Sequence, residues 1–283
     1  MDYPAQRRER LAAALPDVGA DAFLVSSPAN VSYLTNFSGE SSYLVLTRSR
    51  AVLVSDFRFI EQLAEECPGL ETHIRPPSQA LPGAVAEVLG KLGLRSVAFE
   101  SGHLTVAEHE TLRDLAKPLD WKPERDRVEK LRAVKDPSEV AAIREAVDIA
   151  ERAFTAFRAL LRPEDREKDL CDALDNYVRR AGGTGSSFPP IVAVGERAAL
   201  PHAPPTGKAV AEAELLLVDW GASGRFYKSD LTRVLATRSI SPKLEEVYAV
   251  VLKAQQKALA AIRPGAKARD VDAEARGAIA QAG

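Results

Sequence analysis

The chain has 283 residues, a length that predicts about two domains of roughly 100–200 residues each. Apolar residues make up 46% of the chain and charged residues 28%, which excludes a disordered chain and allows a sizeable core. Basic and acidic residues nearly balance at a net charge of -2, which excludes a basic footprint for nucleic acid and a polybasic membrane patch.

The cysteines and the first residues bear on the compartment. Cys67 and Cys171 are far apart and have no close-spaced partner, so neither a zinc knuckle nor a disulfide framework is indicated. The first ten residues are charged, and no apolar run is long enough to span a bilayer or to form the core of a signal peptide. We expect a reducing, cytoplasmic setting, with neither nucleic acid nor a membrane as partner.

The first part of the chain alternates short apolar runs with helical patterns. Strands are predicted at residues 21–26, 43–47, 51–55 and 96–99, and helices at residues 57–67, 79–90 and 105–117. This alternation predicts an α/β layer structure. A charged stretch at residues 122–132 then breaks the strand pattern. We therefore predict a first domain at residues 1–123, a linker helix at residues 124–136 and a second domain at residues 137–283.

The second domain opens with a helix signal. Asp136 can cap, Pro137 suits the first turn, and Glu139 completes a pattern that resembles a capping box. A helical stripe is predicted to be buried and comprises Val140, Ile143, Val147, Ala150, Phe154, Phe157 and Leu161. A second helix at residues 167–181, a strand at residues 188–195 and a hairpin follow. Helices at residues 242–262 and 271–282 then repeat the pattern of a long helix followed by a shorter one, which indicates a duplicated unit whose second copy is cut partway.

Two aspartates in the predicted hairpin are the leading site candidates. Residues 215–218 are apolar and suit a strand, Gly221 and Gly224 mark a turn, and a strand pattern resumes at residue 226. This hairpin brings Asp219 and Asp230 close together. Carboxylate oxygens suit hard divalent cations such as Mn²⁺ or Mg²⁺. Taken alone, the pair fits solvated or turn-capping aspartates better than a metal site, and that alternative stays open at this point.

Four blocks in order carry a family resemblance. They are FPPIVAVG at residues 188–195, ALPHAPPT at 199–206, LVDWGA at 217–222 and KSDLTR at 228–233. They resemble the first half of the pita-bread metallopeptidases, the group of aminopeptidase P, prolidase and the non-peptidase creatinase. NVSYLTNFSG at residues 30–39 and SDFRF at 55–59 resemble the creatinase-type N-terminal domain. The resemblance implies an α/β creatinase-like N-terminal domain followed by an α+β pita-bread domain that is incomplete.

The resemblance also implies roles for individual residues. Asp219 would chelate one metal ion, Asp230 would bridge two ions, and His202 would be catalytic by stabilising the tetrahedral intermediate. The cofactor would be two divalent ions, Mn²⁺ first and Co²⁺ or Fe²⁺ otherwise. The partners would be proline-containing peptides, cleaved at the amide bond before proline. Members often pair through their N-terminal domains, which leaves a homodimer open.

Three of the five metal ligands that the resemblance implies are missing from this sequence. Family members supply three more ligands, a histidine in a glycine-rich block and two glutamates. None of the four histidines here, His73, His103, His109 and His202, lies in such a block. We expect a truncated chain that retains metal poorly and is inactive or nearly so. Two alternatives are a metal-free binding or regulatory homologue and a creatinase-like hydrolase that is not a peptidase.

Overall fold

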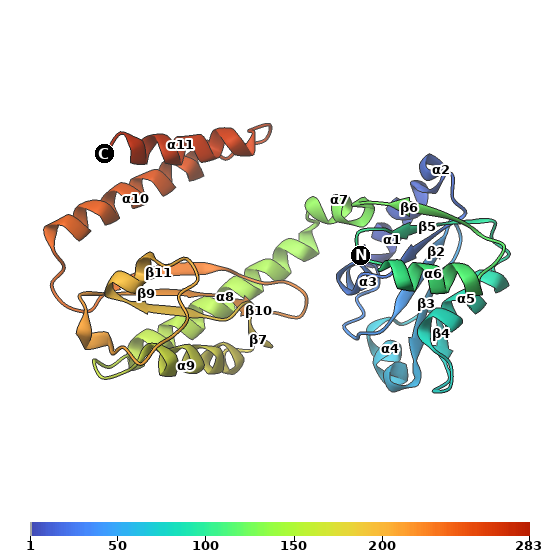
Figure 1. Cartoon of the computed structure of the whole chain (residues 1–283), viewed down its shortest axis with the longest axis horizontal. Helices are drawn as coiled ribbons and strands as arrows, with labels where there is room; N and C mark the ends of the chain where they lie inside the picture. The colour runs from blue at the N-terminus through green and yellow to red at the C-terminus, as the bar shows by residue number, and fades with distance from the viewer. Residues whose placement is uncertain (1) are drawn as a thin grey trace. The chain divides into compact units, whose positions relative to one another are not determined.

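The computed structural model describes residues 2–283, which form two compact units (Figure 1). The first unit runs to Glu145 and also includes Arg225–Tyr227. The second unit comprises Ala146–Gly224 and Lys228–Gly283. The division falls inside one long helix, α8 (Pro137–Leu160).

The first unit is built on a six-stranded sheet of order β4-β3-β2-β1-β5-β6. β1 is antiparallel to β2 and parallel to β5, and β2 is antiparallel to β3. The four strands predicted from sequence are β1 (Ala22–Val25), β2 (Tyr43–Thr47), β3 (Ala51–Asp56) and β5 (Ser96–Glu100), and all four are confirmed. β4 (Glu71–Arg75) and β6 (Asp120–Glu124) were not predicted. Both are edge strands with charged side chains, which masks their strand pattern.

Both faces of this sheet are covered by helices. Along β1, Phe23 and Val25 join one apolar cluster, while Ala22 and Leu24 join another, as strand alternation requires. The first cluster takes side chains from α1 (Tyr3–Ala13), α2 (Leu15–Val18), α3 (Pro28–Thr35), α4 (Ile60–Glu66) and α7 (Arg127–Ala133). The second cluster takes side chains from α5 (Leu81–Lys91) and α6 (Val106–Leu115). The result is a three-layer arrangement, which confirms the α/β layer structure expected from the sequence.

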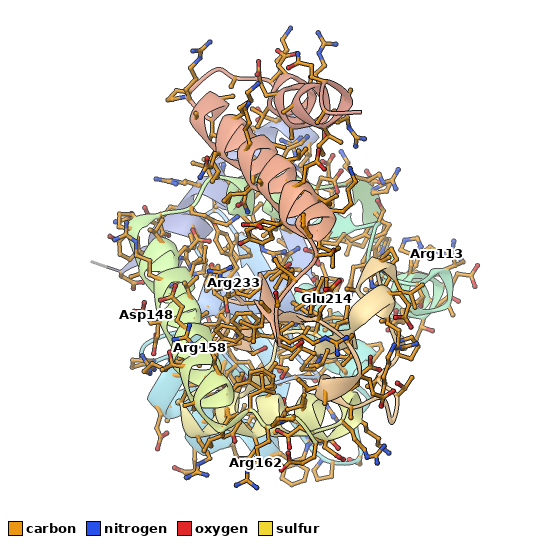
Figure 2. All side chains as sticks on the ribbon, turned by 90° about the vertical axis from the view of Figure 1, so that its left-hand side faces the viewer. Arg113, Asp148, Arg158, Arg162, Glu214 and Arg233 are labelled. Carbon is orange, nitrogen blue, oxygen red and sulfur yellow. The ribbon has the colours of Figure 1, made fainter. Side chains whose placement is uncertain are left out.

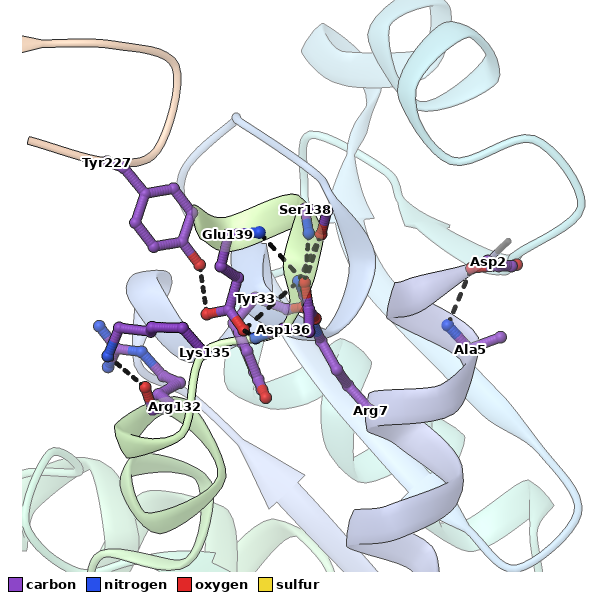
Figure 3. Close-up of polar contacts among 10 residues, drawn as sticks. All are labelled: Asp2, Ala5, Arg7, Tyr33, Arg132, Lys135, Asp136, Ser138, Glu139 and Tyr227. Carbon is purple, nitrogen blue, oxygen red and sulfur yellow. Dashed lines mark hydrogen bonds and ion pairs between the residues drawn. The ribbon is translucent and has the colours of Figure 1, made fainter. Parts of the chain in front are cut away.

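A polar network orders the start of α8 within the first unit (Figure 3). Asp136 accepts hydrogen bonds from the backbone N–H groups of Ser138 and Glu139, and Glu139 accepts one from the N–H of Asp136. This is the capping box predicted from the sequence. The buried Arg7 donates to Asp136 at 2.7 Å, and the Tyr227 hydroxyl donates to the buried Glu139 at 2.6 Å. Burial and that hydrogen bond to Glu139 both raise the pKa of Tyr227.

The second unit follows the predicted order of helix, helix, strand and hairpin. α8 and α9 (Glu167–Arg180) precede β7 (Gly185–Ser186) and β8 (Ile191–Val194), and the sheet has the order β11-β9-β8. The predicted phase of the α8 stripe is wrong at its start, because Val140 is 39% exposed. Ala150 and Phe157 of the predicted stripe are buried as expected, and Ala146, Ile149 and Ala153 are buried beside them. The outer side of α8 is charged and carries Asp148 and Arg158 (Figure 2).

The last two helices lie side by side (Figure 1). They are α10 (Pro242–Ala261) and α11 (Ala268–Ala280), which confirms both helix predictions for this region. α10 exposes apolar side chains, among them Val251 and Leu259. Across residues 2–283, no helix combines the length and the apolar character that crossing a bilayer requires.

Candidate metal site

The hairpin that carries both aspartates keeps one register along its whole length. β9 (Leu215–Trp220) pairs with β11 (Leu231–Ala236), and Asp219 lies opposite Thr232. Nearer the loop, Ser223 of β10 (Ala222–Ser223) lies opposite Lys228, which continues the same pairing without a bulge. The connection is therefore the four residues 224–227.

This register places both carboxylates on the same face of the hairpin. Side chains two residues apart in a strand point to the same side, and directly opposed residues share a face. Asp230 comes two residues before Thr232, the partner of Asp219, so the two aspartates are diagonal neighbours. Such neighbours are typically about 7–8 Å apart, a separation that one or two cations can span. The hairpin prediction for Asp219 and Asp230 is thus matched by the geometry of the backbone.

The opposite face of the hairpin is fixed to α8. Trp220, directly after Asp219, is 1% exposed and donates from Nε1 to the carbonyl of Ala150 at 3.0 Å. Ser229, directly before Asp230, donates from Oγ to the carbonyl of Ala146 at 2.8 Å. The two carbonyls are one helical turn apart. Each aspartate therefore has a buried sequence neighbour, Trp220 for Asp219 and Ser229 for Asp230, that is hydrogen-bonded to α8.

A close backbone approach accompanies this attachment. A Cβ atom on Gly221 would lie 1.9 Å from the carbonyl oxygen of Ser229 and 2.1 Å from Oγ of Ser187. Gly221 was predicted to mark the turn, but the turn lies three residues later. Its lack of a side chain instead allows the strand before Asp230 to pack tightly against the strand after Asp219.

The donor chemistry of the aspartate pair fits a hard divalent cation. Asp219 is partly exposed and accepts a hydrogen bond at 2.8 Å from the Thr232 hydroxyl, while Asp230 is exposed. Ions such as Mn²⁺ and Mg²⁺ prefer several oxygen ligands in near-octahedral geometry. Within residues 2–283, no group of three histidine, cysteine, aspartate or glutamate side chains is placed to hold a metal. Among these residues, the two carboxylates on one face of the hairpin are the candidate metal ligands, and they are a pair rather than a full set.

His202 lies in the loop after the 3₁₀ turn η2 (Gly195–Ala199) and is exposed. In the part of the chain that the structure describes, it joins no metal-type cluster with Asp219 and Asp230. The other histidines belong to the first unit. His109 stacks on Phe99 with ring centroids 4.5 Å apart, and Nδ1 of His103 lies 3.2 Å from Oγ of Ser26.

Two buried polar residues, one beside Asp230 in the chain and one at the base of the loop that carries His202, were missed by sequence reasoning. Ser229 had a usable signal, because it lies in the block that contains Asp230. Glu167 had none beyond its place at the start of α9, yet it is fully buried and bonded to both ends of the loop that carries His202.

Two family models match the chain. Residues 7–134 match the Creatinase/Prolidase N-terminal domain, and residues 141–283 match Metallopeptidase family M24. Together with the fold, these matches define a two-domain metallopeptidase with a creatinase-type N-terminal domain and a pita-bread domain. The chain belongs to metallopeptidase family M24, and the two domain types expected from the resemblance are confirmed.

Similar proteins of known sequence or structure agree with this assignment. The uncharacterized peptidase YqhT of Bacillus subtilis is 32% identical over 275 residues, covering 97% of this chain and 77% of the relative. The Xaa-Pro dipeptidase from Bacillus anthracis is 32% identical with a TM-score of 0.91, covering 99% of this chain and 78% of that one. The X-Pro aminopeptidase from Thermotoga maritima is 28% identical, also with a TM-score of 0.91, and the match covers 98% and 78% of the two chains.

Proposed function

We propose that this protein is an Xaa-Pro peptidase, of prolidase or aminopeptidase P type, that hydrolyses the amide bond before proline with divalent metal at Asp219 and Asp230. The observation that carries the proposal is the unbroken hairpin register, which turns both carboxylates to one face. Membership of family M24 and the similarity to the Xaa-Pro dipeptidase from Bacillus anthracis and the X-Pro aminopeptidase from Thermotoga maritima support the reaction class.

Each candidate residue has a chemical task in this proposal. Asp219 and Asp230 would hold two divalent ions, Mn²⁺ first and Co²⁺ or Fe²⁺ otherwise, with Asp230 between them. Bound ions of this kind lower the pKa of water and polarise a substrate carbonyl. His202 would donate a hydrogen bond to the oxygen that becomes negative in the tetrahedral intermediate. Proline has no N–H to donate, so selectivity for it has to come from the shape of the pocket.

The affinity for metal should be low for the residues described. Two carboxylates leave most positions of a near-octahedral ion to water, and each fixed ligand that is missing weakens binding. We therefore propose that the 283-residue chain binds Mn²⁺ weakly and turns over slowly or not at all at low metal concentration.

The test is Mn²⁺ binding and hydrolysis of an Xaa-Pro dipeptide at rising Mn²⁺ concentration, with an Xaa-Ala dipeptide for comparison. Saturable Mn²⁺ binding that is lost in Asp219→Asn and Asp230→Asn supports the metal site. The matched control is Asp148→Asn, an exposed aspartate on the outer side of α8 (Figure 2), which should change nothing. Hydrolysis that persists in both variants or in the presence of a chelator would overturn the proposal.

A second candidate is a metal-free binding homologue, favoured by the absence of a third ligand among residues 2–283. It predicts that wild-type protein and Asp219→Asn bind Xaa-Pro peptides equally well without Mn²⁺. Metal-dependent chemistry that spares dipeptides would instead favour a creatinase-like hydrolase. The homodimer and the cytoplasmic location stay predictions.

A further inference from the structure

The loop that carries His202 is closed at its base by one buried carboxylate. We call residues 195–205 the His202 loop. Glu167, the first residue of α9, is fully buried and lies between the two ends of this loop. Its Oε1 accepts from the N–H of Val194 at 2.8 Å, just before the loop, and its Oε2 accepts from the N–H and the hydroxyl of Thr206, just after it, at 2.8 and 2.6 Å.

The loop itself also reaches this carboxylate. Arg197 donates from Nε to both oxygens of Glu167 at 3.0 Å and from Nη2 to the carbonyl of Pro204. The guanidinium therefore connects the early part of the loop, the buried carboxylate and the segment two residues after His202. Ala203, the immediate neighbour of His202, is buried and anchors the same segment.

The charge on Glu167 is well supported. Burial alone opposes the ionised form, but hydrogen bonds from Thr206 and Val194 and the nearby Arg197 outweigh it and hold the pKa of Glu167 below its ordinary value. When both oxygens of a buried carboxylate accept hydrogen bonds, moving any donor away leaves a buried charge partly unpaired, so the donors are held in place. The base of the loop is thus fixed, while His202 remains exposed at its far part.

We propose that Glu167 is a positioning residue, which holds the His202 loop in the one conformation that presents the imidazole to a substrate. The effect on catalysis rests on the proposed function. The structural claim is that Glu167 orders the His202 loop, and this claim depends neither on metal binding nor on turnover.

The first test compares amide hydrogen exchange of the wild-type protein and Glu167→Gln. The amide of glutamine keeps an acceptor but loses the charge that faces Arg197, and it can no longer accept from Val194 and Thr206 together. Exchange of peptides from residues 195–206 should rise about tenfold or more, while a peptide from β9 keeps its wild-type rate. The matched control is Glu196→Gln, since Glu196 lies in the same loop but is 80% exposed and forms its ion pair with Lys208.

The second test asks whether the effect passes through His202. In dipeptide hydrolysis at saturating Mn²⁺, Glu167→Gln and His202→Ala should each lower kcat/KM, and the double variant should be no slower than His202→Ala alone. Additive losses would overturn the positioning role. Equal exchange rates in the loop, or a rise spread evenly over the second unit, would overturn the structural claim.

The two tests separate the possible failures. If wild-type protein neither binds Mn²⁺ nor hydrolyses the dipeptide, the proposed function fails, and the exchange comparison still decides whether Glu167 orders the loop.

Discussion

Replacing Ser229 by alanine should weaken the attachment of the aspartate hairpin to α8 without changing its shape. The Ser229 hydroxyl is 5% exposed, accepts from the N–H of the buried Ala222 at 3.0 Å and donates to Ala146. The variant leaves the Ala222 N–H without this acceptor in a dry environment. An unsatisfied buried donor costs about 1–3 kcal/mol, so the free energy of unfolding of the second unit should fall by that amount.

The assay is urea unfolding followed by tryptophan fluorescence. The chain has two tryptophans, so a Trp121→Phe background leaves Trp220 as the reporter of the second unit. The matched control is Ser186→Ala. Ser186 lies opposite Ala222 in the β10–β7 pair, and its buried hydroxyl oxygen has no hydrogen-bond partner within residues 2–283. This control should be neutral or slightly stabilising. A Ser229→Ala loss below about 0.5 kcal/mol, or an equal loss in Ser186→Ala, would refute the reasoning.

Three further predictions concern single residues. Trp220→Phe keeps an aromatic ring beside Phe154 but loses the bond to Ala150, so the free energy of unfolding should drop by at least about 0.5–1.5 kcal/mol. Because this variant lacks the fluorescence reporter, its urea titration is followed by circular dichroism, and no drop would contradict the role of that bond. The hydrogen bond from Arg58 lowers the pKa of Asp56 from 3.8 to about 2. Ionised Asp56 therefore stabilises the first unit at pH values above its pKa in the unfolded chain, and this contribution is lost as the pH falls through its pKa in the folded protein. Unfolding measured across that window should show a flatter pH dependence in Asp56→Asn, and an unchanged slope would rule out this carboxylate as the source. Added Mn²⁺ should raise the melting temperature of the wild-type protein, a chelator should reverse the rise, and Asp219→Asn should show neither effect.

The sequence was most informative where local signals and tertiary structure coincide. The capping box at Asp136 and Glu139 forms as expected, because it needs only residues three positions apart. β4 and β6 were missed, because an edge strand has one neighbour and tolerates charged side chains. The predicted α8 stripe is wrong at Val140, which is exposed although it is apolar, and right at Ala150 and Phe157, which are buried. The sequence did not single out Ala146 and Ala153, small buried residues on the same side as Ala150, the residue whose carbonyl bonds to Trp220.

The candidate site was only partly predictable for a similar reason. Asp219 and Asp230 could be paired through the hairpin, since glycines and apolar runs mark such turns. The roles of Ser229 and Glu167 could not be found this way, because their partners at Ala146 and Thr206 are 83 and 39 residues away. A buried polar side chain is explained by what lies around it, and sequence spacing does not report that environment.

The uniform pairing of the hairpin limits where its length can change. One residue added to or removed from either strand of the hairpin would turn the side chains beyond that point to the opposite face of the sheet. One carboxylate would then point toward α8, and Trp220 or Ser229 would become exposed. Extra residues placed between Gly224 and Tyr227 leave that alternation untouched. Insertion scanning should therefore find a tolerant tip between two intolerant arms.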